Sequence, residues 1–160
     1  HHTIQATSKQ DFATSGTSQN GSFDYLVVCD THGKNRITLK YDFQLKELFE
    51  NLEWKTLLQE DNFFEIIQNK IKNIDTHRIG STLSICKIYP DRFENYWVGD
   101  SSIKIYSKGD EIWRTKDHDY NNEDDITRIQ ELNSFLRMKN SIDSIAHTKT
   151  NIIQVNSKTF

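Results

Sequence analysis

The segment between residues 23 and 34 constrains the fold of this chain most strongly, because an apolar run within it ends abruptly in a short polar motif. Residues 25–29 are tyrosine, leucine, two valines and cysteine in unbroken succession, which is typical of a strand buried on both faces. Residues 30–33 then read Asp-Thr-His-Gly, and Gly33 lets the backbone turn sharply. Such a strand would deliver a carboxylate and an imidazole to one point. The alternative is a strand followed by a purely structural Asp/Gly turn.

The length and composition predict one globular domain. The chain has 160 residues, enough to bury a substantial core, so we expect a single domain over residues 3–160. Its mean hydropathy is -0.73, yet nine phenylalanines, six tyrosines and three tryptophans supply bulky core material. The 20 basic residues are scattered among 23 acidic ones, without the basic block that tracks a phosphate backbone. We therefore expect no nucleic-acid partner.

The cysteines and the hydropathy pattern predict a cytoplasmic protein. Cys29 and Cys86 each lie in an apolar run, which indicates buried, reduced thiols rather than a disulfide framework. No stretch approaches 18 apolar residues and no charged-then-apolar leader opens the chain, so we expect neither a membrane span nor a signal peptide. His1 and His2 are typical of a purification tag and receive no functional role. The sequence leaves the oligomeric state and the natural substrate open.

The first half of the chain reads as strands followed by two helices. Residues 3–8 and 36–41 alternate weakly, as short strands do, and the polar residues 14–22 read as a loop. After Phe43 the apolar residues recur at helical spacing, and a second helix is expected from an N-cap at Asp61 through Asp75. We expect both helices to pack on the sheet that contains Val27, burying Leu45, Leu48, Phe49, Leu52, Ile67 and Ile71.

The second half reads as a strand meander followed by a helix. Strands are expected at 80–89 and 95–98, and a hairpin at 102–114 turns at Gly109. Residues 122–137 return to helical spacing, and residues 150–157 are compatible with a last strand. This order predicts an α+β domain with helices packed on a largely antiparallel sheet.

Several motifs in register resemble the PPM family, the protein phosphatase 2C-like, metal-dependent serine/threonine phosphatases. The main three are Gln10-Asp11, the Asp-Thr-His-Gly of residues 30–33, and Val98-Gly99-Asp100-Ser101. Residues 80–82, 115–118 and 123–129 also resemble family segments. The resemblance covers about residues 3–130, roughly the N-terminal half of the family domain. It implies a β-sandwich flanked by antiparallel helices, here incomplete at the C-terminus.

The resemblance also implies a reaction and a set of residues that perform it. Family members hydrolyse phosphoserine or phosphothreonine in a phosphorylated protein, using water that bridges two Mg²⁺ or Mn²⁺ ions. Carried over, Asp11 would bind one ion, Asp30 would bridge two, and the backbone carbonyl of Thr31 would be a further ligand. Asp100 would hold a weaker third ion. His32 matches the family's general acid.

For each of these residues a structural role remains the alternative. The three aspartates and His32 are also common turn or strand-end residues. His77, His118 and His147 are expected to face solvent. If the functional assignment holds, Asp11 and Asp30 should lie side by side.

The chain also departs from the family pattern. The family has a phosphate-binding arginine upstream of the acidic pair, but the first arginine here is Arg36, and Lys34 replaces the second glycine of the signature. The two later metal-binding aspartates of the family have no counterpart, since residues 138–160 contain only Asp143.

These departures leave three hypotheses open: a truncated or divergent phosphatase, a catalytically inactive PPM-like module that binds phosphoproteins or another partner, and an unrelated α+β interaction domain. We expect the 160-residue chain alone to have little activity.

Overall fold

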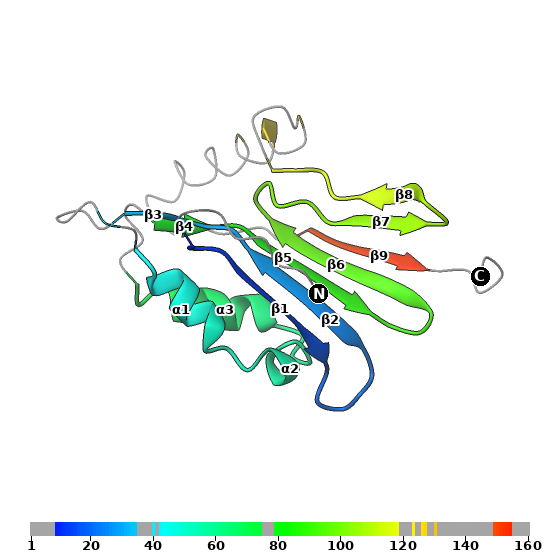
Figure 1. Ribbon diagram of the computed structural model, residues 1–160, viewed down its shortest axis with the longest axis horizontal. Helices are drawn as coiled ribbons and strands as arrows, with labels where there is room; N and C mark the ends of the chain where they lie inside the picture. The colour runs from blue at the N-terminus through cyan, green and yellow to red at the C-terminus, as the bar shows by residue number, and fades with distance from the viewer. Residues whose placement is uncertain are drawn as a thin grey trace.

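An antiparallel sheet with helices on one face forms the centre of the molecule (Figure 1). The computed structural model describes residues 9–34, 40, 42–74 and 79–118, positions 123, 126, 127 and 130, and the backbone of residues 149–154. In spatial order the strands of this sheet are β1 (Phe12–Thr17), β2 (Asp24–Cys29), β5 (Leu83–Ile88), β6 (Arg92–Val98) and β9 (Lys149–Gln154). Each strand is antiparallel to its neighbours.

Smaller elements surround this sheet. Strand β3 (Thr31–Gly33) pairs with β4 (Ile79–Ser81) as a two-stranded ribbon, and β7 (Lys104–Ser107) pairs with β8 (Asp110–Arg114) as a hairpin. The helices are α1 (Gln44–Glu50), α2 (Trp54–Leu57) and α3 (Phe63–Ile71). The expected α+β class is therefore confirmed. No described helix has the length and apolar character needed to cross a membrane.

The core lies between the helices and the face of the sheet that carries Val27. Of the six side chains expected to be buried there, Leu45, Phe49, Leu52 and Ile67 are buried, whereas Leu48 and Ile71 are half-buried. The indole Nε1 of Trp54 donates a hydrogen bond to the carbonyl of Phe49 (2.9 Å) and so ties α2 to α1. The one-sided apolar spacing thus predicted the packing of the helices correctly.

The expectation that β2 is buried on both faces is wrong. Tyr25, Val27 and Cys29 are buried against the helices, but Leu26 and Val28 are 42% and 45% exposed. They point to the opposite face of the sheet, because side chains alternate along a strand. The described helices leave that face uncovered around these two residues, so an unbroken apolar run here marks a strand with one covered face.

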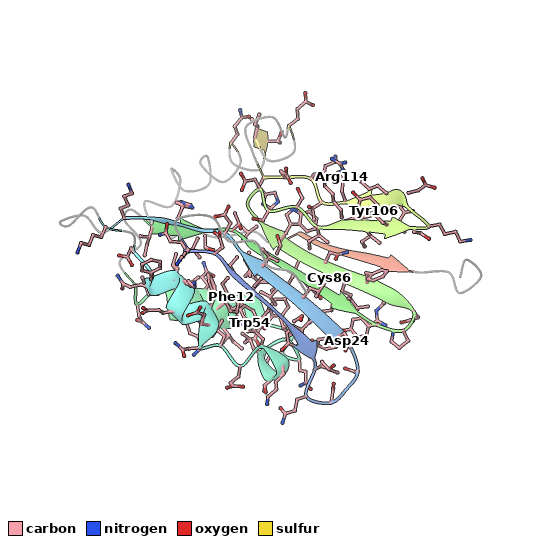
Figure 2. The ribbon with its side chains drawn as sticks, viewed as in Figure 1. Phe12, Asp24, Trp54, Cys86, Tyr106 and Arg114 are labelled. Atoms are coloured by element: carbon pink, nitrogen blue, oxygen red, sulfur yellow. The ribbon has the colours of Figure 1, made fainter. Side chains whose placement is uncertain are left out.

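The expectation of a loop over residues 14–22 is also wrong in its first part, because β1 extends to Thr17. β1 pairs with β2 along its whole length, from Phe12 opposite Cys29 to Thr17 opposite Asp24. Phe12 anchors the strand by stacking on Trp54, with ring centroids 6.2 Å apart (Figure 2). Gly16 lies under the ring of Tyr25, where an added Cβ would come within 2.7 Å of the tyrosine hydroxyl. Pairing and packing therefore outweigh the turn-like composition of this segment.

Helix α3 begins after the residue expected to cap it. Asn62, not Asp61, occupies the N-cap position, and its side chain makes no capping hydrogen bond. Helix α2 and the ribbon strand β3 were not expected from the sequence. The polar motif after β2 therefore continues as a strand, although Gly33 has the positive φ of 131° that favours glycine.

The meander expected in the second half is confirmed. The expected strand at 80–89 is divided by Thr82 into β4 and β5, and the hairpin turns at Lys108 and Gly109, which both have positive φ. Residues 150–154 form part of β9, and the four described positions between 121 and 130 are helical. The expected strand at 3–8, the rest of the helix at 122–137, and all of 36–41 except position 40 lie outside the described residues.

Candidate active site

The strand register brings three aspartates to one end of the main sheet. Asp11 immediately precedes β1 and Asp30 immediately follows β2, and the adjoining residues Phe12 and Cys29 are directly paired. Asp100 follows β6 at the same end, because the end of β6 lies beside the start of β5. Segments distant in sequence therefore deliver their carboxylates to one place, and Asp11 and Asp30 are neighbours as expected.

The electrostatics of Asp30 show how closely the acidic residues lie. Partial burial raises the pKa of Asp30 above its ordinary value. The charge of Asp11, a hydrogen bond between the two carboxyl groups, and the charge of Asp100 raise this pKa further, while His32 lowers it. Asp30 is also exposed to solvent, so a ligand can reach the charges gathered around it. The site is a crowded acidic cluster, defined here as Asp11, Asp30 and Asp100.

Thr82 holds the backbone of Asp30 in place. The backbone N–H of Asp30 donates to the Thr82 hydroxyl (3.1 Å), and the backbone N–H of Thr82 donates to the Asp30 carbonyl (2.9 Å). The Thr82 hydroxyl also pairs with the hydroxyl of Ser101 (2.5 Å), the residue after Asp100. Gly99 allows this approach, because an added Cβ would lie 2.7 Å from the Thr82 methyl group. Thr82 thus connects the segments that carry Asp30 and Asp100.

Gln10 holds the segment that carries Asp11. Gln10 is only 2% exposed. Its side-chain Nε2 donates hydrogen bonds to the carbonyl oxygens of Gly33 (2.8 Å) and Asp42 (2.9 Å). The backbone carbonyl of Gln10 accepts a hydrogen bond from the hydroxyl of Thr31. One buried amide therefore ties the start of β1 to the end of β3 and to the residues before α1.

His32 projects from the ribbon across Gly80, its pairing partner in β4. A Cβ on Gly80 would lie 2.7 Å from Nε2 of His32, so any other residue at position 80 would displace the ring. The imidazole is exposed, and its charge acts on Asp30. An accessible acid–base group therefore stands beside the acidic cluster.

Residues 115–118 close around the segment that carries Asp100. Trp97 Nε1 donates to the carbonyl of Lys116 (2.9 Å), and Ser102 Oγ donates to the Asp117 carboxylate (2.7 Å). The ring of His118 stacks on Trp97, and its Nδ1 accepts a hydrogen bond from the Gly99 N–H (3.3 Å). The expectation that His118 faces solvent is therefore wrong, since it is a packing and positioning residue. His77 and His147 lie outside the described residues.

The donor set of the acidic cluster fits a hard divalent cation. Among the described residues, no group of three or more His, Cys, Asp or Glu side chains is arranged to hold a metal ion. Mg²⁺, however, is commonly bound by one or two carboxylates and completes its shell with water. Asp11 and Asp30 are such a pair, and their mutual repulsion is what a cation would relieve.

Comparisons with known proteins identify the family and the fold of the chain. A family model described as protein phosphatase 2C matches residues 1–148. No curated protein matches the chain. Among solved structures, a serine/threonine phosphatase of S. agalactiae superimposes with a TM-score of 0.59 at 19% identity, covering 96% of this chain and 71% of that one. The serine/threonine phosphatase of Staphylococcus aureus gives a TM-score of 0.52 at 20% identity, with 92% and 66% covered.

A bacterial serine phosphatase variant gives a TM-score of 0.54 at 19% identity, covering 92% of this chain and 68% of that one. At these identities the structures show the fold, and the family model shows the family. The hypothesis of an unrelated interaction domain is therefore wrong. The chain belongs to the protein phosphatase 2C family, the PPM-type serine/threonine phosphatases.

Proposed function

We propose that this chain hydrolyses phosphoserine and phosphothreonine in protein substrates as a metal-dependent phosphatase. The observation that carries the proposal is the convergence of Asp11, Asp30 and Asp100 at one end of the sheet, beside the exposed His32. Three carboxylates in one place repel each other, and a bound divalent cation offsets that repulsion. Oxygen ligands of this kind suit Mg²⁺ or Mn²⁺.

Each residue of the proposed site has a role that its surroundings support. Asp11 and Asp30 would hold the cation between them, and Asp100 would serve a more weakly held ion. Thr31 would contribute its backbone carbonyl, a role that is compatible with a side chain already engaged with Gln10. When bound, such ions lower the pKa of bound water and offset charge on the phosphoryl group. His32 would donate a proton to the departing serine or threonine oxygen.

Binding of the phosphate group is expected to be weak. Two arginines lie in the described part of the chain, and both are engaged by acids away from the cluster. Arg92 pairs with Asp91 and Glu94, and Arg114 pairs with Glu111. A bidentate arginine clamp on phosphate therefore has no candidate among the described residues. We expect slow turnover by the 160-residue chain.

We also propose that the protein acts in the cytoplasm. Both cysteines, Cys29 and Cys86, are buried and free. Free thiols are typical of reducing compartments, where disulfides are rare.

The test is the release of phosphate from a phosphoserine peptide in millimolar Mn²⁺, comparing the unaltered chain with the Asp30→Asn and Asp24→Asn variants. Asp24 is the matched control, because it lies on the same strand at the end away from Asp30 (Figure 2). We expect slow, Mn²⁺-dependent release that Asp30→Asn abolishes and Asp24→Asn preserves. Release that persists in Asp30→Asn, or peptide binding without any release, would contradict the proposal. The second outcome would instead support a binding module.

A further inference from the structure

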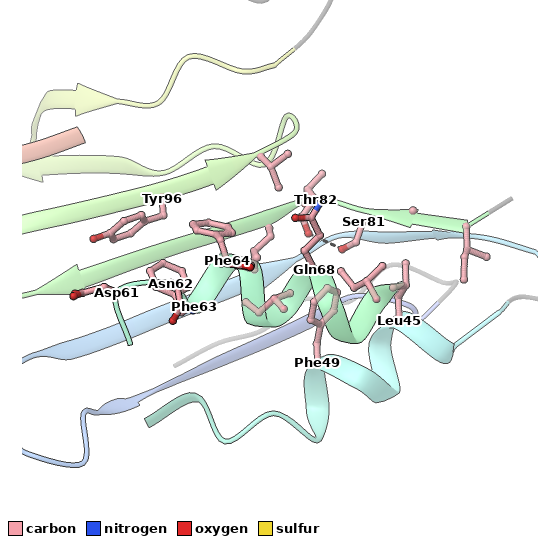
Figure 3. Close-up of a pocket in the computed structure, with 17 residues that line it drawn as sticks. Leu45, Phe49, Asp61, Asn62, Phe63, Phe64, Gln68, Ser81, Thr82 and Tyr96 are labelled. Carbon is pink, nitrogen blue, oxygen red and sulfur yellow. Dashed lines mark hydrogen bonds between the residues drawn. The ribbon is translucent and has the colours of Figure 1, made fainter. Parts of the chain in front are cut away.

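A cavity lies between α3 and the strands β4, β5 and β6 (Figure 3). Its volume is about 650 Å³, and α1 contributes Leu45 and Phe49 to its wall. Small-molecule sites in proteins typically measure about 300–1,000 Å³ and are mostly apolar with a few polar groups. This cavity has that character, since its lining includes Phe64, Ile67 and Ile71 of α3 and Tyr96 and Val98 of β6.

The polar groups that line the cavity select the charge of an occupant. Asp61 and Glu65 bring carboxylates to its rim, and the described residues that line it include no lysine, arginine or histidine. The nearby Lys87 is not among them. Its ammonium group is enclosed by aromatic rings, 4.7 Å from the centre of Phe63 and 5.1 Å from that of Tyr96.

The negative charge of Asp61 interacts with Lys87 and raises the pKa of its ammonium group, against the lowering effect of burial. Glu65 has no ion pair or hydrogen bond among the described residues. An anion would therefore meet unbalanced negative charge at Glu65, and a cation would be attracted there.

We propose that this cavity binds a small apolar amine, with its hydrocarbon body between α3 and β6 and its protonated nitrogen at Glu65. The proposal does not depend on the phosphatase chemistry, although Gly80 and Thr82, which adjoin His32 and Asp30, also line the cavity. The cavity does reach the ribbon that carries His32. Ile79 and Ser81 line it from β4, and alternation along the strand places their side chains on the face opposite to His32. An occupant would therefore contact this ribbon from behind the histidine.

The test uses three matched probes with the full chain: naphthylethylamine, naphthylethanol and naphthylacetate. They share an aromatic body and differ in charge, so their affinities separate apolar from electrostatic recognition. Binding is measured by calorimetry, and its location by the backbone amide signals of residues 79–83 in NMR spectra. The Glu65→Gln variant removes one charge without changing the shape, and Glu60→Gln is the control because Glu60 is exposed and does not line the cavity. Ile71→Arg places a cation at the cavity wall.

We expect the amine to bind more tightly than the alcohol, and the carboxylate to bind most weakly. Glu65→Gln should weaken amine binding about two- to fivefold, as for other exposed ion pairs, and leave the alcohol unchanged. Ile71→Arg should weaken the amine further, and Glu60→Gln should have no effect. The proposal is wrong if the amine fails to bind at millimolar concentration, if the carboxylate binds equally well, or if either Glu65→Gln or Ile71→Arg leaves amine binding unchanged.

Discussion

A single buried amide illustrates how individual residues position the acidic cluster. Gln10 is almost fully buried and donates to the carbonyl oxygens of Gly33 and Asp42. Leucine at this position would remove a donor from both part-buried carbonyls. Gly33 would keep a bond from the Asp42 N–H (3.3 Å), but the Asp42 carbonyl would lose its Gln10 partner, and an unsatisfied group costs about 1–3 kcal/mol. We predict that Gln10→Leu lowers the free energy of unfolding by at least about 1 kcal/mol, measured by urea denaturation. Gln59→Leu is the control, because that amide makes an exposed hydrogen bond to the Lys55 carbonyl four residues earlier. Equal midpoints for Gln10→Leu and the unaltered chain would show that these bonds contribute nothing.

Lys87 makes stability depend on pH. Burial lowers the pKa of Lys87, an effect that the carboxylates of Glu94 and Asp61 partly offset. The unfolded chain therefore keeps this proton to higher pH than the folded chain does. Consequently Lys87 favours the folded state increasingly as the pH rises from the lowered folded pKa to the ordinary value of 10.5.

The corresponding variant is Lys87→Met, which removes the charge and keeps an unbranched apolar side chain. We predict that it is more stable than the unaltered chain at pH 7 and that this advantage shrinks as the pH approaches 10.5. Urea denaturation at several pH values measures the difference, and Lys55→Met, at an exposed position, should show no such trend. An advantage that is constant or grows with pH would contradict the assignment.

At the level of elements, the β3–β4 ribbon determines the position of the His32 side chain. Gly80 provides the space for the imidazole, because a Cβ there would approach Nε2 to 2.7 Å. We predict that Gly80→Ala moves the His32 ring while the fold is retained, shifting the His32 ring signals in NMR spectra and lowering any phosphatase rate. Gly21→Asn is the control, since asparagine tolerates the positive φ of 71° and an added Cβ at Gly21 meets nothing within 4 Å. Unchanged His32 signals in Gly80→Ala would contradict this account of the ribbon.

The helices also show how far sequence spacing can predict an element. The i, i+3, i+4 recurrence of Leu45, Leu48 and Phe49 correctly predicted α1 and its packing on the sheet. The start of α3 was placed too early, because Asp61 is a favourable capping residue by type but lies outside the helix. Helix boundaries depend on local backbone geometry that side-chain type alone does not determine.

For the whole molecule, the sequence predicted the class of fold better than its exposed faces. The apolar run of β2 gave no indication that Leu26 and Val28 face solvent, because a run of apolar residues looks the same whether one face or both are covered. Strand β1 was missed for a related reason. Its two threonines, its serine and its glycine resemble a loop, and only pairing with β2 and contact with Trp54 make it a strand.

The sequence predicted the aspartates of the candidate site but not the hydrogen bonds that hold their segments in place. Asp11, Asp30 and Asp100 stand in recognisable motifs, and the strand register brings them together. Their supporting contacts join residues far apart in sequence, such as Thr82 with Ser101 and His118 with Gly99. No local pattern encodes such pairs, so His118 was assigned to solvent and the linking role of Thr82 was not anticipated.

Direct measurement of Mn²⁺ binding tests the central claim, that the convergent carboxylates form a divalent-cation site. Calorimetric titration of Mn²⁺ into the unaltered chain, Asp11→Asn, Asp30→Asn and Asp24→Asn compares two cluster residues with an exposed aspartate at the other end of β2. The site predicts similar Mn²⁺ affinity for the unaltered chain and Asp24→Asn, and affinity at least about tenfold weaker for the other two, equivalent to about 1.4 kcal/mol or more. Equal affinity in all four proteins, or binding to none, would contradict the claim.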